Sequence, residues 1–327
     1  MTGHTALIVG AGFSKPFGGP LLRELLSDEN CAKSKATPES LRALSTLVGR
    51  MTVGGSVPNL ESAFTSIWDE QYTNRNFEIG GEDWPAKDLL VALRLHLGSV
   101  MAGVRLDGRK PITMLLRRYL RKLVKESRTL TVVSFNYDTV IEDAFASEGL
   151  LYSYGPRNAI RFTDKSIERK LDKIVPYAEV LKLHGSVNWG VCRECDETPV
   201  GRDLINAFSH PYVPPRNISC QFCEKRFLVP SIVPPVLTKG PALQSLEPLW
   251  IRARKTLSRA REIVIVGYSL PGADSQATSL LQSVDGPLKR PRITVVCGAR
   301  GAPASYQSLF RKFSEFKEPF EAFLERS

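Results

Sequence analysis

The segment TALIVGAGFS, Thr5–Ser14, is a short apolar run that leads into the glycine turn Gly10-Ala11-Gly12. A helix is expected soon after it, over Leu21–Leu26. The order strand, glycine turn, helix is how nucleotide-binding α/β domains begin. Glycine lets the backbone approach a diphosphate that a Cβ atom would exclude, and a helix N-terminus adds N–H donors. We therefore predict an α/β fold with a Rossmann-type parallel sheet.

This turn departs from the usual dinucleotide fingerprint in two ways. Lys15 stands where a third glycine is expected, and no acidic residue ends a strand about 20 residues further on. Either the site is not that of a dehydrogenase, or no dinucleotide binds there. The alternative explanation of the glycines is that they serve the turn alone.

Four further apolar segments are expected to be strands, namely Leu130–Phe135, Glu179–Leu183, Ile263–Val266 and Ile293–Val296. Polar or glycine residues directly follow three of them: Asn136 and Asp138, then His184, then Gly267-Tyr268-Ser269. Because α/β proteins bind ligands at the carboxyl ends of parallel strands, these residues are candidates for one site.

Each of these residues also has a simpler interpretation. Asn136 or Asp138 would cap the helix expected over Thr139–Phe145, and that role is favoured from this segment alone. Asp274 is expected to be the N-cap of the next helix, and Gly267 to make a turn.

The segment 31–110 does not continue the strand pattern and is expected to be a helical insertion. Its helices are expected over Ser40–Gly49, Leu60–Tyr72 and Trp84–Val104. Next comes an amphipathic helix over Pro111–Ser127, with proline suited to its first turn. The basic residues on that helix indicate a solvated face rather than a polyanion site.

Four of the six cysteines form two CxxC pairs that are separated by 24 residues. Four thiolates in two such turns are the set that zinc prefers in structural sites, so we predict a Cys₄ zinc ribbon. A redox dithiol is the alternative. The predicted ligands are Cys192, Cys195, Cys220 and Cys223.

These features divide the chain into four parts. A discontinuous sheet domain is expected over 1–30, 111–190 and 229–300, with the helical insertion over 31–110. The zinc-binding module is expected over 191–228. Phenylalanines recur at steps of three and four after position 309, which predicts a C-terminal helical segment over 301–327, either as one helix or as two short ones broken at Pro319.

The chain has 327 residues and a formal net charge of +10, which favours anionic partners such as nucleotides, nucleic acid or an acidic protein surface. A basic surface that only confers solubility explains the charge equally well. No signal peptide is recognisable, and no apolar run approaches the roughly 20 residues that cross a bilayer. We therefore expect a cytoplasmic protein without a membrane partner.

Taken together, five motifs in this order resemble the sirtuin superfamily, and its bacterial sirtuin-like branch more than the protein deacylases. The motifs are GAGFS (Gly10–Ser14), SFNYD (Ser134–Asp138), KLHGSVNW (Lys182–Trp189), the two CxxC pairs and IVGYSLPGAD (Ile265–Asp274). The resemblance implies a sheet that binds NAD and carries an inserted zinc ribbon. Two departures lie on the nicotinamide side: Phe135 replaces a glutamine of the deacylases, and their arginine after the glycine turn is absent.

The resemblance also implies roles for individual residues. The NAD diphosphate would lie at Gly10, Ala11, Gly12 and Ser14. Asn136 and Asp138 would line the nicotinamide and ribose pocket, and His184 would act on the ribose. A second cofactor contact maps to Gly267 and Ser269.

The first functional hypothesis is an NAD⁺ glycohydrolase that releases nicotinamide and ADP-ribose. Sirtuin-like proteins of this kind act in bacterial antiphage defence by NAD depletion, once an oligomer or a partner activates them. The expected partners are a second copy of the chain and a defence protein such as an ATPase or an Argonaute-like protein, with nucleic acid involved indirectly. The alternatives are an NAD-dependent protein deacylase and a non-catalytic sensor of NAD or ADP-ribose.

Overall fold

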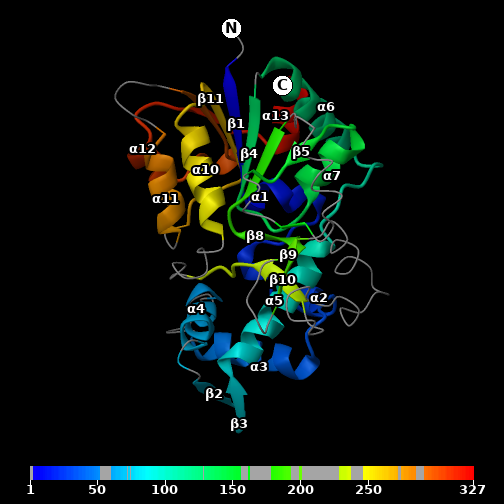
Figure 1. Ribbon diagram of the computed structural model, residues 1–327, viewed down its shortest axis with the longest axis vertical. Coiled ribbons are helices and arrows are strands. Elements are labelled where there is room, and N and C mark those ends of the chain that lie inside the picture. The colour runs from blue at the N-terminus through cyan, green and yellow to red at the C-terminus, as the bar shows by residue number, and fades with distance from the viewer. Residues whose placement is uncertain are drawn as a thin grey trace. The chain divides into compact units, whose positions relative to one another are not determined.

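The computed structural model describes residues 3–51, 60–71, 73, 75–127, 129–155, 161–162, 178–192, 199–200, 228–236, 246–271, 274–284 and 291–327. The chain divides into two compact units (Figure 1). The first comprises Met1–Gly19, Val104–His184 and Ser245–Ser327, and the second comprises Pro20–Gly103 and Gly185–Gln244.

A seven-stranded sheet forms the centre of the first unit, and every strand pairing in it is parallel. This confirms the prediction of an α/β fold with a parallel sheet. The central strands are buried along nearly their whole length, as expected of a parallel sheet covered on both faces. The strand order is β13 (Ser314–Phe316), β12 (Arg292–Val296), β11 (Glu262–Val266), β1 (His4–Val9), β4 (Thr129–Ser134), β7 (Ala178–Lys182) and β5 (Tyr152–Ser153).

The register aligns the carboxyl ends of the four central strands. Val9 lies opposite both Val266 and Ser134, and Ser134 lies opposite Lys182. From β1 the chain continues to β4 on one side, whereas β11 lies on the other. Chain order therefore reverses beside β1, and ligands of open α/β sheets bind at such a reversal.

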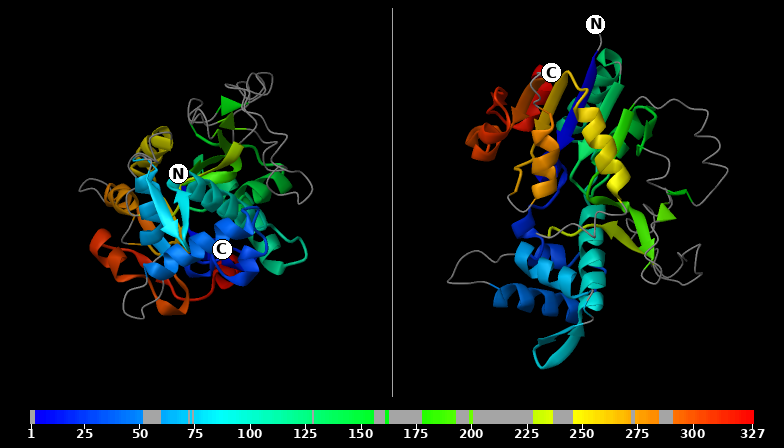
Figure 2. Two further views of the ribbon diagram at one scale, coloured as in Figure 1. Left: turned by 90° about the horizontal axis from the view of Figure 1, so that it is seen from below. Right: turned by 60° about the vertical axis from the view of Figure 1, so that its left-hand side comes forward.

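Two groups of helices accompany the sheet (Figures 1 and 2). In one group α6 (Pro111–Glu126) packs against α7 (Val140–Ser147) and α13 (Phe320–Arg326). In the other α11 (Ser275–Gln282) packs between α10 (Glu247–Leu257) and α12 (Ala304–Leu309). The short helix α1 (Ala11–Ser14) and a 3₁₀ turn over Lys15–Phe17 follow β1.

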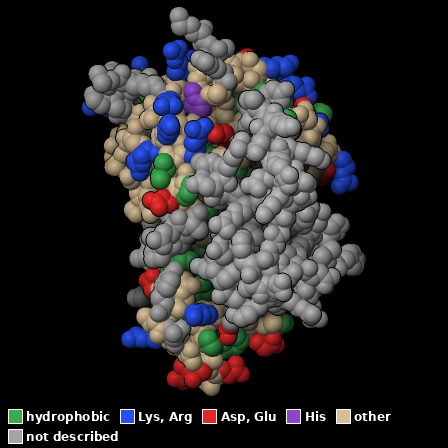
Figure 3. Space-filling model, in the orientation of Figure 1, with side chains coloured by type: hydrophobic (Ala, Val, Ile, Leu, Met, Phe, Trp, Pro, Cys, Tyr) green, Lys and Arg blue, Asp and Glu red, His purple; other side chains and the backbone are tan. Residues whose placement is uncertain are grey.

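The basic face of α6 is largely engaged within the chain. Arg117 and Arg121 each donate through Nε to the Glu148 carboxylate at 2.6 Å. Arg118 donates to the Leu324 carbonyl at 3.4 Å, and Lys122 donates to the Ser327 carbonyl. These contacts favour a structural role for the basic residues over a polyanion site. Figure 3 shows other Lys and Arg side chains spread over the described surface of this unit.

The C-terminal segment 301–327 was expected to be helical, and the structure differs there. It contains α12 and α13, but β13 lies between them and adds an edge strand beside β12. The expected break at Pro319 is present, because α13 begins at Phe320 directly after it. Phe316 and Phe323 still meet, with ring centroids 5.4 Å apart, through tertiary packing rather than one helical face.

The second unit contains most of the expected insertion. The helices of this unit that the structure describes include α2 (Asp28–Cys31), α3 (Pro38–Arg50), α4 (Leu60–Glu70) and α5 (Ala86–Ala102). The predicted helix at Leu21 is only a 3₁₀ turn, Leu22–Glu24. The predicted start of α5 at Trp84 is also wrong, because β2 (Asn76–Ile79) and β3 (Glu82–Pro85) form a hairpin there. Gly80 and Gly81 both have positive φ, as its two-residue turn requires.

A second sheet includes β8 (Gly185–Cys192), a strand that we did not predict from the sequence. It pairs antiparallel with β10 (Leu228–Ile232) and with β9 (Pro199–Val200). Helix α5 packs against β10, where a Cβ on Gly98 would come within 2.4 Å of Pro230 Cγ. Strand β6 (Arg161–Phe162) belongs to the first unit. Among the described residues, none of the helices is long and apolar enough to cross a bilayer.

Candidate active site

The predicted site residues follow the carboxyl ends of four adjacent strands of the first unit. Gly10 follows β1, Asn136 follows β4, His184 follows β7 and Gly267 follows β11. These positions are far apart in sequence, and only the parallel register brings them to one edge. The sheet therefore places candidate residues from four separate motifs along a common edge.

The glycine turn packs tightly against the turn after β11. Gly10 N–H donates to the Val266 carbonyl at 3.1 Å, and Gly12 N–H donates to the Gly267 carbonyl at 2.8 Å. A Cβ on Gly10 would lie 2.6 Å from Tyr268 Cδ2, and one on Gly12 would lie 2.8 Å from Gly267 Cα. The close contact between the two turns is therefore enough to explain why positions 10 and 12 are glycine. The side chain of Ala11, between them, is exposed.

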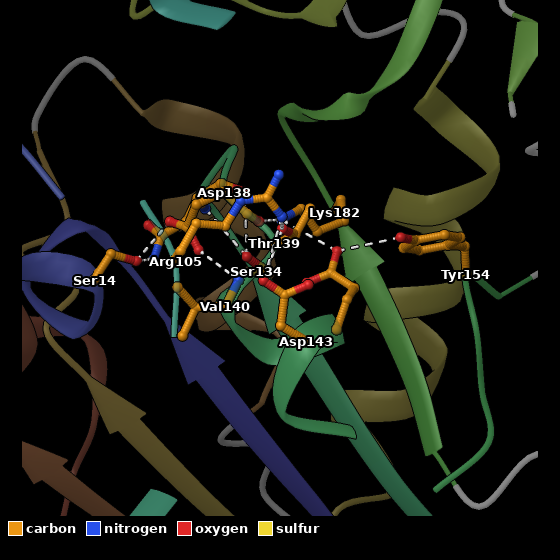
Figure 4. A network of polar contacts seen from close by, with 11 residues as sticks. Ser14, Arg105, Ser134, Asp138, Thr139, Val140, Asp143, Tyr154 and Lys182 are labelled. Carbon is orange, nitrogen blue, oxygen red and sulfur yellow. Dashed lines mark hydrogen bonds and ion pairs between the residues drawn. The ribbon is translucent and has the colours of Figure 1, made fainter. Parts of the chain in front are cut away.

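A buried hydrogen-bond network joins Ser14, Asn136 and Asp138 (Figure 4). Asn136 Nδ2 donates to the Gly10 carbonyl and to Ser14 Oγ, both at 2.8 Å. Ser14 Oγ donates in turn to Asp138 Oδ2 at 2.6 Å. Because a carbonyl only accepts, the contact with Gly10 fixes which end of the amide is nitrogen. The amide oxygen of Asn136 is left as an acceptor.

The other oxygen of Asp138 accepts from the N–H of Val140 at 3.1 Å, at the start of α7. The N-cap position of α7 is Thr139, whose side chain makes no capping hydrogen bond, so the prediction that Asp138 is the cap is wrong, although its carboxylate accepts from the first N–H of the helix. The same carboxylate also accepts from Ser14, so it links this helix to the glycine turn. Asn136 is not the N-cap of α7 either, and its amide group donates to Gly10 and Ser14 instead.

Two buried titratable side chains, Lys182 and Glu142, lie next to this network, and Figure 4 shows Lys182 beside Asp138. Lys182 Nζ lies 3.5 Å from Glu142 Oε1 and donates to the backbone carbonyl of Asp138. Tyr154 OH donates to the same Glu142 oxygen at 3.3 Å. Burial raises the pKa of Glu142, and the ammonium of Lys182 opposes that rise. Sequence analysis missed this pair, although a lysine within an apolar strand is the signal that would reveal it.

His184 is 7% exposed and lies among aromatic rings. The Phe135 ring centroid is 5.3 Å from that of His184 with an edge-on geometry, and that of Trp250 is 6.1 Å away. Phe135 also stacks on Tyr268 with centroids 4.1 Å apart. The phenylalanine that departs from the deacylase pattern therefore forms part of the aromatic wall around the histidine. Trp250 Nε1 donates to the Leu183 carbonyl at 3.1 Å, and this bond fixes the backbone between the end of β7 and His184.

Asp274 contributes a buried carboxylate to this group of side chains, a contact that the sequence did not predict. It occupies the N-cap position of α11, as predicted, but its side chain makes no capping hydrogen bond. Its Oδ2 instead accepts from Tyr268 OH at 2.8 Å and lies 3.4 Å from His184 Nε2. Burial, together with this carboxylate, raises the pKa of Tyr268 well above its usual value.

The loop between β11 and α11 also carries Ser269 and Leu270. Ser269 is exposed, so its hydroxyl faces solvent or a ligand. Leu270 is buried with a φ of 51°, in the left-handed region that residues with a Cβ rarely adopt. Tyr306 OH donates to the Tyr268 carbonyl at 2.7 Å and helps to hold this loop.

The predicted zinc ligands lie outside what the structure describes. The backbone of Cys192 ends β8, but its side chain and residues 195, 220 and 223 are not described. Among the described residues, His, Cys, Asp and Glu form no group that would hold a metal ion. Cys31 and Cys297 are free cysteines.

No protein-family model matches the chain, and no curated protein does so. Similar solved structures include a Sir2 bound to acetylated peptide, 16% identical over 99% of this chain and 91% of that chain, with a TM-score of 0.47. A second is a complex of Sir2, a p53 peptide and NAD⁺, 16% identical over 98% and 90%, with a TM-score of 0.47. At this identity and TM-score, the likeness supports no conclusion about the activity or the ligands of this chain.

Proposed function

We propose that this chain is an NAD⁺ glycohydrolase that cleaves the nicotinamide–ribose bond and releases nicotinamide and ADP-ribose. The observation that carries the proposal is the position of Asn136. Its amide is locked by Gly10 and Ser14, at the sheet edge that His184 also follows. The proposal also rests on the five motifs that resemble the sirtuin superfamily.

The reaction demands little from the protein beyond orientation and one base. Nicotinamide leaves NAD⁺ as a neutral molecule, so its departure requires no general acid. The enzyme must stabilise the cationic ribose of the transition state and must direct a water molecule to it. A base that takes the proton of that water supplies the remaining step.

Asn136 suits the orienting role because both of its amide hydrogens are already bonded within the chain. Its remaining oxygen can only accept, so it would orient a water molecule or a ribose hydroxyl by accepting their hydrogen. Asp138 would act through the loop, because Ser14 and the N–H of Val140 occupy its carboxylate oxygens. Ser14 would then support both residues rather than contact the diphosphate with its hydroxyl.

His184 would be the base. Its ring lies in a mainly aromatic environment with a carboxylate at Nε2, and a neutral imidazole protonated there has Nδ1 as its acceptor. The diphosphate would lie at the glycine turn, where Ala11 offers an exposed position. Ser269 would supply a further polar contact from the loop after β11.

The finer proposal is a regulated, cytoplasmic effector of bacterial antiphage defence that acts by NAD depletion. Free NAD hydrolysis is harmful to a cell, so we propose that a homo-oligomer or a defence partner such as an ATPase or Argonaute-like protein controls it. Cys192, Cys195, Cys220 and Cys223 would hold a structural zinc ion. Metal analysis of the purified chain, repeated with Cys220→Ser, tests that ligand set.

The test of the function is nicotinamide release from NAD⁺ by the purified full-length chain, followed by chromatography over a range of protein concentrations. We expect release by the wild-type chain and its loss in Asn136→Ala and His184→Ala. Asn76→Ala, on the exposed face of β2, is the matched control and should keep full activity. Robust activity in both site variants would contradict the roles, and no nicotinamide release at any concentration would contradict the function.

The same assay separates the two alternatives. A deacylase would release nicotinamide only when an acyl-lysine peptide is added, and the peptide would lose its acyl group. A sensor would bind NAD or ADP-ribose in calorimetry without turnover. Hydrolysis that is independent of peptide supports the glycohydrolase alone.

A further inference from the structure

A carboxylate, a phenol and an imidazole form a buried cluster at the edge of the sheet. Asp274 is 1% exposed, and its Oδ2 receives the hydroxyl hydrogen of Tyr268 at 2.8 Å. His184 Nε2 lies 3.4 Å from that same oxygen. The three residues come from two loops that follow β7 and β11, with the phenol next to Gly267. The cluster therefore spans two of the four strand ends that make the candidate site.

A capping role does not explain why Asp274 is buried. Side chains at an N-cap usually accept from the helix N–H groups two or three residues later, and Asp274 makes no such bond. Its backbone carbonyl accepts from the N–H of Thr278 at 3.0 Å, and this bond would form with any side chain. A carboxylate is costly to bury unless polar partners compensate the loss of water. Tyr268 and His184 are polar neighbours of the Asp274 carboxylate, so its burial is explained by these two contacts rather than by capping.

We propose that Asp274 is the positioning residue of His184, and that its carboxylate sets which imidazole nitrogen carries the proton. The neutral imidazole would keep its hydrogen on Nε2, directed at Asp274, and would present Nδ1 as the acceptor. The consequence for catalysis rests on the proposed function, whereas the contact itself does not. The aromatic rings of Phe135 and Trp250 support the same arrangement, because they pack against the imidazole and restrict its rotation.

The proposed reaction replaces one bond at ribose C1′ and moves one proton to His184. Water gives one proton to His184 Nδ1, and its oxygen forms the new bond to ribose C1′. The bond from C1′ to the pyridinium nitrogen breaks, and its electron pair leaves with neutral nicotinamide. The imidazolium that forms faces the carboxylate of Asp274, which lowers the energy of that charge, and then returns the proton to solvent.

The first test observes the tautomer directly and needs no activity. The chain has four histidines, so nitrogen-15 labelling of histidine gives few signals, and His184→Ala identifies the signal of interest. We expect wild-type His184 to be protonated at Nε2 in its neutral form. Asp274→Asn and Asp274→Ser should lose or reverse that preference. An unchanged His184 signal in both variants would overturn the proposal.

These two substitutions also exclude a capping explanation. Asn and Ser are as good at an N-cap as Asp, so both preserve any contribution to the start of α11. The thermal midpoint of each variant, measured beside wild type, confirms that the fold is retained. If the role of Asp274 were capping, both variants would keep the wild-type tautomer and rate.

The second test is kinetic and uses nicotinamide release. General bases contribute about 10²–10⁴-fold to rate, so Asp274→Asn should lower kcat by about 10²-fold and change KM little. In a His184→Ala background the same substitution should cause no further loss, since the carboxylate acts through the imidazole. An equal further loss in that background would overturn the positioning role. Absence of nicotinamide release by wild type would overturn the proposed function instead, and the tautomer measurement would still decide the role of Asp274.

Discussion

Lys182→Met should destabilise the chain in a way that depends on pH. The Lys182 and Glu142 side chains are 1% and 2% exposed and lie 3.5 Å apart. Removal of one member of a buried ion pair costs about 3–5 kcal/mol, because the other charge remains buried without compensation. For a chain of 327 residues, a loss of about 3 kcal/mol lowers the thermal midpoint by about 4 °C.

The pH dependence follows from the pKa of Glu142. Burial raises this pKa above the ordinary 4.5, and Lys182 opposes the rise, so the substitution raises it further. A carboxyl whose folded pKa exceeds its unfolded pKa contributes stability that is fully present below the unfolded value. That contribution is lost as pH rises through the folded pKa. Lys182→Met should therefore lose little stability near pH 4.5 and progressively more as the pH is raised.

The assay is thermal unfolding followed by circular dichroism at about pH 5 and about pH 8. Lys182→Met with Glu142→Gln should recover much of the loss at the higher pH, because no buried charge remains. Lys255→Met on α10 removes an exposed lysine and should change the midpoint little at either pH. An equal loss at both pH values, or no recovery in the double variant, would refute the reasoning.

Three further perturbations follow from contacts of the first unit. Gly267→Ala should cost more than about 2 kcal/mol in urea unfolding, because its φ is 60° and a Cβ would lie 2.2 Å from Phe13 N. Burial raises the pKa of Glu148, but hydrogen bonds from Arg121 and Arg117 outweigh it and hold that pKa below 4.5. Wild type should therefore lose more stability than Glu148→Gln when the pH falls below about 4.5, and equal acid sensitivity would contradict this. Ser14→Ala should lower kcat about tenfold or more, because the hydroxyl donates to Asp138 and accepts from Asn136, while Ser258→Ala at an exposed position should not.

Local sequence patterns predicted the strands and the residues that follow them. β1, β4, β7, β11 and β12 lie within a residue or so of their expected positions, because buried strands of a parallel sheet are short apolar runs. The convergence of Asn136, His184 and Gly267 on one edge was also predictable, since parallel strands end at the same side. The strand positions and their common edge follow from local sequence patterns and from the parallel arrangement, without any side-chain contact.

Contacts between distant residues were not predictable in the same way. The pairing of Asp274 with His184 joins two loops 90 positions apart, and nothing in the loop sequence distinguishes it from a cap. β13 is a strand because β12 offers an open edge, which a helical spacing of phenylalanines cannot reveal. β8, by contrast, was predictable, because the residues of Ser186–Trp189 alternate polar and apolar side chains with the period of a strand.

The glycine turn requires a test that does not use its glycines. Gly10 and Gly12 are needed for packing against the turn after β11, so a loss of activity on their substitution would say nothing about a ligand. Ala11 is exposed at the first position of α1, where proline is tolerated and the N–H has no helical acceptor. Gly10 has φ −129° and ψ −171°, an extended conformation that suits a residue before proline.

Ala11→Pro should therefore keep the fold and remove one N–H donor from the predicted diphosphate position. A hydrogen bond to a charged group contributes about 1.5–3 kcal/mol, so the Kd for NAD should rise about tenfold or more in calorimetry. Ala11→Ser retains the N–H and is the matched control, with an unchanged Kd. If Ala11→Pro bound NAD with wild-type affinity, the result would contradict the prediction that the diphosphate binds at this turn. The glycines of the turn would then be explained by packing alone.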